Sequence, residues 1–282
     1  MIDPTVVEEL IDRALAEDIG FCDLTSELVI PADARAELAL NARQDIVVAG
    51  LDVAAQVFRR RVPECRVELR VKDGERVKAG TAMGRVEGPA RGLLAVERTA
   101  LNFLQHLSGV ATLAAQYAER IAGTRAALID TRKTTPGLRA LEKHAARLGG
   151  ARNHRLRLDD GVLIKDNHIS VCGSISAAVK RARAGAPVLT KVEVECDTLE
   201  QVKEALEAGA DMILLDNMSV DELRKAVALS GGRVPLEASG GVRLETIRAI
   251  AETGVDFISV GRITQSAPAA DIGLDAVIGG RS

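Results

Sequence analysis

The chain has 282 residues, of which 47% are hydrophobic and 27% charged, and its formal net charge is −3. This is an ordinary globular composition, long enough for one large domain and a smaller one. Aromatic residues make up 2% of the chain and Trp is absent, which argues against a base-stacking surface, and the negative charge argues against a duplex-binding face. No apolar stretch reaches the roughly 18 residues that a membrane span needs.

The cysteines and the N-terminal sequence predict a cytoplasmic protein. Four cysteines, Cys22, Cys65, Cys172 and Cys196, form neither a Cys-x-x-Cys pair nor a Cys/His pattern typical of zinc sites. We therefore expect reduced thiols. The first residues lead directly into an amphipathic pattern without a basic segment and an apolar run, so we expect no signal peptide.

The first 90 or so residues mix helical and strand patterns. Asp3-Pro4 is typical of a helix start, and polar and apolar residues alternate over 36–42 and 66–71, as in half-buried strands. Together these patterns predict a small α+β sandwich. A long helix is expected from Ala90 to Leu107, with Gly109 ending it and a second helix continuing to about residue 122.

Arg98 interrupts the apolar stripe of this long helix. It shares a helix face with Leu94 and Leu101, which lie four residues before it and three after it. Two interpretations remain open. The side chain either extends from the edge of the stripe into water, or it points toward an anionic ligand.

From residue 126 onward the rhythm changes to apolar runs that alternate with helical patterns. Strands are expected at 126–130, 162–165, 188–195, 212–216, 235–239 and 257–261. The last four end near Glu195, Asp216, Ser239 and Gly261, at intervals of 21, 23 and 22 residues, enough for one strand, one helix and two turns. Such repeats predict a parallel α/β barrel; an open doubly wound sheet is the weaker alternative.

A basic island covers residues 130–168. It carries nine Lys and Arg against five Asp and Glu, and three of the four histidines, within a chain whose net charge is negative. The basic residues gather at the ends of elements, which favours an anion site over a solvated helix face. Ligands of parallel βα folds bind at the carboxyl ends of the strands. The residues expected to face one pocket there are Arg132, Lys133, Lys165, Glu195, Asp216, Asn217, Ser239, Gly240, Gly241 and Gly261.

Several of these residues admit more than one role. Ser239-Gly240-Gly241 and Gly261 either form tight turns or bind phosphate through backbone N–H groups, and the late position in a barrel favours phosphate. Glu195 and Asp216 are salt-bridge partners, a general acid and base, or ligands for Mg²⁺ or sugar hydroxyls. We prefer the ligand role, because the surrounding cations are expected to lower the pKa values of both carboxyls.

His154 is the histidine expected in the pocket. Beside Arg155 it either hydrogen-bonds a carboxylate of the ligand or is a structural histidine bonded to the backbone.

Seven motifs in this order carry a family resemblance: DTRKTTPGLR, GG-x-x-NHR, LIKDNH, VEVE, LLDN, EASGG and SVG. The chain resembles the quinolinate phosphoribosyltransferases, also called nicotinate-nucleotide pyrophosphorylases (carboxylating). The resemblance implies conversion of quinolinate and phosphoribosyl pyrophosphate to nicotinate mononucleotide, pyrophosphate and CO₂, with Mg²⁺, in NAD biosynthesis. It also implies an N-terminal sandwich at 1–107, an incomplete α/β barrel at 108–267, and a return of 268–282 to the first domain.

The resemblance further implies site roles. The two quinolinate carboxylates would be held by four residues, Arg132, His154, Arg155 and Lys165. Lys133 would meet pyrophosphate or substrate, and Glu195 and Asp216 would hold ribose hydroxyls and Mg²⁺. The ribose phosphate would lie against Ser239, Gly240, Gly241 and Gly261.

Family members are homodimers with shared active sites, which implies that Arg98 reaches the neighbouring subunit's site. Assembly of dimers into a hexamer is left open.

Three positions depart from the family pattern: Ala151 and Arg157 replace glycines, and His144 replaces an aromatic residue. The two glycine replacements are acceptable if their backbone φ angles are negative. Two other functions remain as alternatives. One is the related phosphoribosyltransferase linked to molybdate transport, whose acceptor is unknown and which tends to lose the NHR and KDNH motifs. The other is a non-catalytic sensor of an anionic nucleotide.

Overall fold

The computed structural model describes residues 3–277. By packing, the chain divides into two units. The first runs up to Ala115 and adds Thr135–Gly149 and the chain from Ser266 onward, and the second comprises Gln116–Thr134 and Gly150–Gln265. Within residues 3–277, no helix combines the length and the apolar character needed to cross a bilayer.

A four-stranded antiparallel sheet with the order β12-β1-β5-β3 forms the centre of the first unit. The bounds are Arg35–Ala42 for β1, Arg66–Leu69 for β3, Ala82–Pro89 for β5 and Ile272–Ala276 for β12. A separate ladder joins β2 (Ile46–Val47) to β4 (Arg76–Val77). The segment around β12 therefore pairs with β1 of the same unit; of the expected return over 268–282, residues 278–282 lie outside the described residues.

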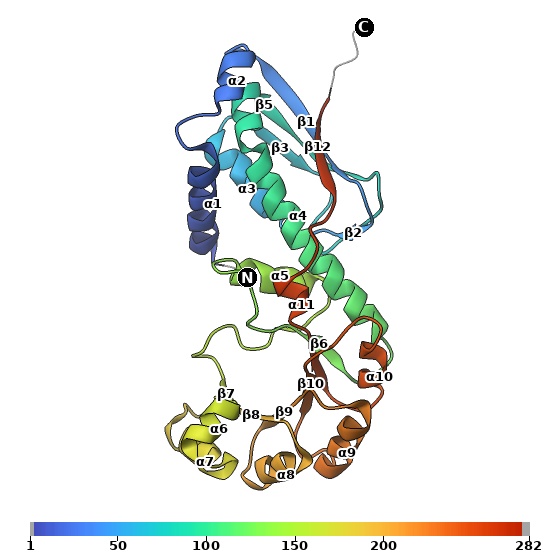
Figure 1. The fold of residues 1–282 in the computed structure, drawn as a ribbon. Helices are drawn as coiled ribbons and strands as arrows, with labels where there is room; N and C mark the ends of the chain where they lie inside the picture. The colour runs from blue at the N-terminus through green and yellow to red at the C-terminus, as the bar shows by residue number, and fades with distance from the viewer. Residues whose placement is uncertain (1–2, 278–282) are drawn as a thin grey trace. The chain divides into compact units, whose positions relative to one another are not determined.

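The first unit also contains helices. Their bounds are Pro4–Ile19 for α1, Leu24–Val29 for α2, Leu51–Arg61 for α3, Ala90–Arg120 for α4 and Arg139–Leu148 for α5. Apolar side chains of α3 and α4, such as Phe58 and Leu104, meet Leu40 and Val86 of the sheet. The expected α+β sandwich is confirmed (Figure 1).

Helix α4 corrects the expected break at Gly109, because it runs unbroken through this residue. A Cβ at Gly109 would lie 2.1 Å from the carbonyl oxygen of Pro268. The glycine therefore allows the returning C-terminal segment to lie against the helix backbone. Sequence reasoning took a packing glycine for a helix breaker.

A six-stranded parallel sheet with the order β6-β11-β10-β9-β8-β7 forms the second unit. The bounds are Ala127–Ile129 for β6, Val162–Ile164 for β7, Val192–Cys196 for β8, Met212–Asp216 for β9, Leu236–Ser239 for β10 and Phe257–Ser259 for β11. The strands that follow one another in sequence are neighbours, except that β6 and β7 are opposite edges. Arg152 forms a parallel bridge with Ile129 at the open edge of β6. The expected incomplete barrel is confirmed.

Most helices of this unit lie along the outer side of this sheet, but the short helix that follows β11 does not (Figure 1). Their bounds are Asp166–Cys172 for α6, Ile175–Gly185 for α7, Leu199–Glu207 for α8, Val220–Ser230 for α9, Ile247–Ala251 for α10 and Arg262–Gln265 for α11. Thr198 and Ser219 start α8 and α9 with capping boxes.

One expected strand is shorter than predicted. Instead of covering 188–195 it begins at Val192, and Val188 and Leu189 are 100% and 97% exposed.

Side chains along β8 alternate between the two faces of the sheet, which places two glutamates on the same face. Val192, Val194 and Cys196 are buried on one face of the strand. Because successive side chains of a strand point to opposite faces, Glu193 and Glu195 share the other face, which is the interior of the barrel.

Candidate active site

A cavity of about 260 Å³ opens at the carboxyl ends of β6, β10 and β11. Five of the predicted site residues line it: Lys133, Ser239, Gly240, Gly241 and Gly261. The Lys133 backbone is fixed on both sides, because its N–H donates to Thr131 Oγ1 at 3.0 Å and its carbonyl accepts from Thr264 Oγ1 at 2.7 Å. One ammonium group thus lies beside two glycine turns, as an anion site requires.

Two glycines of this cavity have no room for a side chain. Gly240 has a φ of +91°, and a Cβ there would lie 2.1 Å from Asn217 Oδ1. At Gly261 a Cβ would lie 2.9 Å from Lys133 Cδ. The glycines therefore let the backbone and the Lys133 side chain come close to a bound group.

A second group of predicted residues lies at the ends of β7, β8 and β9. The Lys165 ammonium forms an ion pair with Glu195, whose side chain is 13% exposed. Asp216 accepts a hydrogen bond from Asn217 Nδ2 at 2.6 Å and is near enough to Lys165 and Lys133 for both charges to act on its pKa. Lys133 therefore links this group electrostatically to the glycine-lined cavity.

The expected lowering of both carboxyl pKa values is wrong for Asp216. Burial, followed by the charge of Asp197, raises the pKa of Asp216, and the lysines and the Asn217 hydrogen bond only partly oppose this. Sequence reasoning counted the cations but could not see how much water the barrel wall removes from this carboxyl.

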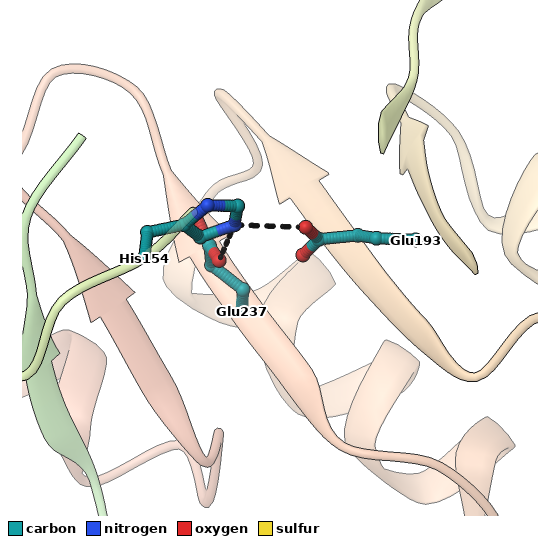
Figure 2. Close-up of side chains that lie close together, drawn as sticks. All are labelled: His154, Glu193 and Glu237. Carbon is teal, nitrogen blue, oxygen red and sulfur yellow. Dashed lines mark hydrogen bonds and ion pairs between the residues drawn. The ribbon is translucent and has the colours of Figure 1, made fainter. Parts of the chain in front are cut away.

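His154 lies at a third group of polar residues, in the interior of the barrel. Figure 2 shows Glu193 of β8 and Glu237 of β10 converging on its ring. His154 Nε2 lies 2.9 Å from Glu193 Oε2 and 3.5 Å from Glu237 Oε2. The Glu193 and Glu237 side chains are only 7% and 2% exposed. This is the only group of three or more His, Cys, Asp and Glu in residues 3–277 whose ligand atoms lie within 4.8 Å of one another.

The turn that carries His154 is fixed by a buried aspartate. Asp130, which is 0% exposed, accepts hydrogen bonds from the His154 N–H at 2.8 Å and from Asn153 Nδ2 at 2.6 Å. Arg155 donates from Nη1 to the Gly161 carbonyl at 3.0 Å. Burial and the nearby charge of Arg132 lower the pKa of Arg155, so the two arginines are neighbours.

Arg155 and His154 line a cavity of about 330 Å³ that is distinct from the glycine-lined one. Its wall includes Lys191, Glu193 and the apolar residues Met212 and Phe257, at or near the amino ends of their strands. The residues predicted to line a single pocket are therefore divided between two cavities. The Lys165–Glu195 pair and Asp216 lie at the carboxyl ends of β7, β8 and β9.

Arg98 lies in the first unit, on α4, with an exposed side chain beside Glu97. Leu101 on the same helix face is buried and Leu94 is only partly exposed, so Arg98 lies at the edge of the apolar stripe.

Sequence reasoning missed Glu193 and Glu237. A signal was present, because Glu193 and Glu195 alternate in the VEVE strand and must share a face. Glu237 carried no such signal, since a single acid in PLEAS fits an edge position equally well.

The departures at Ala151 and Arg157 are accommodated. Among the described residues, Asn217 is the only non-glycine residue with a positive φ, at 53°. The condition set for the two positions is therefore met.

Known proteins resemble this chain over nearly its whole length. The profile of the quinolinate phosphoribosyl transferase C-terminal domain matches residues 110–275, and that of the N-terminal domain matches residues 23–108. A probable nicotinate-nucleotide pyrophosphorylase (carboxylating) of Bacillus subtilis is 40% identical over 98% of this chain and 95% of its own length. The nicotinate-nucleotide pyrophosphorylase (carboxylating) of Mycobacterium leprae is 44% identical over 95% of this chain and 96% of its own.

Solved structures agree. The nicotinate-nucleotide pyrophosphorylase of Francisella tularensis superposes with a TM-score of 0.94 at 38% identity, over 98% of both chains. That of Ehrlichia chaffeensis gives a TM-score of 0.92 at 42% identity, over 96% of this chain and 98% of its own.

Proposed function

The chain belongs to the quinolinate phosphoribosyltransferase family, and from this membership we propose that it transfers the phosphoribosyl group of phosphoribosyl pyrophosphate to quinolinate. The products are nicotinate mononucleotide, pyrophosphate and CO₂, in NAD biosynthesis. The observation that carries the proposal is the glycine-lined cavity with Lys133, beside the Lys165, Glu195 and Asp216 group at the carboxyl ends of the barrel strands.

Charge explains the basic residues of this site. Quinolinate is a dianion and its partner carries several phosphate charges, so the two repel each other unless cations lie between them. In this proposal Arg132, Arg155 and Lys165 hold the quinolinate carboxylates, because guanidinium groups match carboxylates bidentately. Arg155, which donates to the Gly161 carbonyl and lines the cavity near the amino ends of the strands, has to turn toward Lys165 to do so. His154 belongs to the same turn. The ribose phosphate lies against Ser239, Gly240, Gly241 and Gly261, and Lys133 faces the phosphates.

Transfer joins the ring nitrogen of quinolinate to the anomeric carbon, while the bond from that carbon to pyrophosphate breaks and its electron pair leaves with pyrophosphate. The sugar becomes cation-like in between. Glu195 and Asp216 stabilise that charge and hold the ribose hydroxyls. Loss of one such group typically costs about 2.7–4 kcal/mol of barrier, roughly a hundredfold to a thousandfold in rate.

Decarboxylation follows from the positive charge of the alkylated ring. The bond to the carboxylate next to the ring nitrogen breaks, CO₂ leaves, and the electron pair remains on the ring carbon, which then takes up a proton. The pyridinium stabilises this pair, so the protein needs mainly to position the ring.

The donor set at Glu195 and Asp216 fits Mg²⁺. Mg²⁺ prefers carboxylate oxygens and is usually held by one or two of them together with substrate phosphates, and both carboxyls lie at the carboxyl ends of neighbouring strands. The Lys165 ammonium contacts Glu195, so this carboxylate would be shared between the lysine and the metal. When bound, Mg²⁺ supplies positive charge to the leaving pyrophosphate.

The exposed position of Arg98 supports a homodimer with shared active sites, in which this side chain serves the partner's barrel. Phe21, Leu24, Leu28 and Val29, around α2, are 64–101% exposed and give the first unit an apolar surface that an interface would cover. We place the enzyme in the cytoplasm, where the four free cysteines stay reduced.

Incubation with quinolinate, phosphoribosyl pyrophosphate and Mg²⁺ tests the proposal. We expect CO₂ release that depends on all three and stops when a chelator removes the metal. Turnover of a different acid without CO₂ from quinolinate would favour the transporter-linked relative, and binding without turnover would favour a nucleotide sensor.

A further inference from the structure

Two glutamates that no assigned role uses lie under His154, in the interior of the barrel. Glu193 on β8 and Glu237 on β10 are separated by β9, and their side chains meet over it (Figure 2). Burying two carboxyls side by side is unfavourable unless they are hydrogen-bonded, paired or neutralised. The burial of these two carboxyls therefore implies that they bind another group in the protein.

The hydrogen bonds of His154 define its tautomer. The Arg155 backbone N–H donates to His154 Nδ1 at 2.8 Å, so Nδ1 is the unprotonated, accepting nitrogen. The ring proton therefore lies on Nε2, which donates to Glu193 Oε2 at 2.9 Å. Both ring nitrogens are thus engaged inside the protein.

The surroundings of Glu237 favour its protonated form. Burial and the charge of Glu193 raise the pKa of Glu237 well above its ordinary value, against the smaller opposing effects of the Ser259 hydroxyl and the Lys165 charge. Among the described residues, no donor forms a hydrogen bond with Glu193 Oε1 or Glu237 Oε2, and His154 Nε2 lies 3.5 Å from Glu237 Oε2. A proton carried by Glu237 supplies a donor between the two carboxyls and leaves one negative charge, which Lys165 and Arg155 offset.

The same tautomer disfavours a metal ion at this cluster. A metal bound to His154 Nε2 would require the proton to move to Nδ1, where it would face the Arg155 N–H. The ligand atoms of His154, Glu193 and Glu237 are spaced as in a metal site, but the proton on His154 Nε2 prevents this nitrogen from coordinating a metal.

We infer that Glu193 and Glu237 are positioning residues, which hold His154 by its Nε2–H and through it fix the Asn153–Arg155 turn that presents Arg155 to the acceptor. The turn is then held from two sides: Asp130 binds its backbone and the Asn153 amide, and the glutamate pair binds its ring. The inference rests on the proposed function for the identity of the acceptor, but not for the tautomer.

Steady-state kinetics of Glu193→Ala test the positioning role. The variant loses the hydrogen bond between His154 Nε2 and Glu193 that holds the turn. We therefore expect the KM for quinolinate to rise about tenfold or more while the KM for phosphoribosyl pyrophosphate stays within about twofold. Because Glu193 acts through the histidine, His154→Ala should show the same split, and the double variant should be no worse than the single ones. Effects that multiply, or a quinolinate KM that does not move, would overturn the inference.

Asp211→Asn is the matched control. Asp211 also supports β8, since its Oδ2 accepts from the Val192 N–H at 2.8 Å, but it has no contact with His154. We expect it to lower thermal stability without separating the two KM values. A similar split in this variant would mean that any loosening of β8 suffices, and would also overturn the inference.

Nitrogen-15 NMR of the imidazole rings provides a second measurement on the unmodified enzyme, which has four histidines. With the His154 signals identified by their absence in His154→Ala, we expect the ring proton on Nε2 and an unprotonated, hydrogen-bonded Nδ1. An imidazolium, an Nδ1–H tautomer, or a change on adding Zn²⁺ would contradict the assignment. This result stands even if Glu193→Ala fails to fold. A wild-type enzyme that releases no CO₂ would instead contradict the proposed function.

Discussion

Glu237 makes stability depend on pH in an unusual direction for a carboxyl. Its folded pKa is raised, so the folded state binds more protons than the unfolded one, and stability falls as pH rises from about 4.3 toward the folded pKa. The slope is at most about 1.4 kcal/mol per pH unit. Gln at this position cannot ionise. We therefore expect the Tm of Glu237→Gln to rise relative to that of the wild type as the pH increases from about 4.3 toward the folded pKa of Glu237.

Thermal unfolding at several pH values measures the effect. Glu200→Gln on the exposed face of α8 is the control, and should follow the wild type at every pH. A Tm difference for Glu237→Gln that stays constant with pH would mean that Glu237 is ionised in the folded protein.

Gly240 is needed because it lacks a Cβ atom. A Cβ there collides with Asn217 Oδ1, so Gly240→Ala must displace either the turn or Asn217, which in turn holds Asp216. A displacement of this size near a reacting group can reduce the rate about a hundredfold. We expect a large loss in kcat/KM for phosphoribosyl pyrophosphate with little change in the KM for quinolinate.

Gly232→Ala controls for backbone strain alone. Gly232 has a similar φ of +78°, but a Cβ there would meet nothing within 4 Å. It should lower stability slightly and leave kcat/KM unchanged. Equal kinetic losses in both variants would show that strain, and not the collision with Asn217, explains the effect.

Gly109 lies within helix α4 and affects the stability of the helix in two opposing ways. Ala is the better helix former by about 1 kcal/mol, so propensity alone predicts that Gly109→Ala stabilises α4. Contact of the new Cβ with the Pro268 carbonyl opposes this, and overpacking of this kind usually costs about 1–3 kcal/mol. We expect a lower Tm by calorimetry.

Gly185→Ala, at the end of α7, is the matched substitution without a neighbour. Nothing lies within 4 Å of its added Cβ, so it should be neutral or slightly stabilising. If Gly109→Ala also proved stabilising, the close approach of the returning segment to α4 would be wrong.

The proposal of shared active sites predicts that two inactive variants complement each other in a mixed dimer. Arg98→Ala and Arg132→Ala should each be folded and inactive, because each removes one guanidinium from every site of the dimer. After subunit exchange, a mixed dimer has one site with both arginines, so the mixture should recover about a quarter of wild-type activity. This estimate assumes random pairing of equal amounts and additive, independent sites.

The assay is CO₂ release before and after exchange, with exchange proven by tagged subunits. Recovery absent under proven exchange would place both arginines of a site on the same subunit. An active Arg98→Ala variant would remove Arg98 from the site altogether.

Patterns in the sequence predicted the fold class, the positions of the barrel strands along the chain and most of the residues at their carboxyl ends. These follow from local rules: apolar periodicity, chain spacing of 21–23 residues between strand ends, and glycine turns such as Ser239-Gly240-Gly241. How those residues combine became clear only from the packed chain. The Glu237 partnership with His154, the raised pKa of Asp216 and the need for glycine at residue 109 all depend on groups distant in sequence, because burial and close approach are properties of the packed chain.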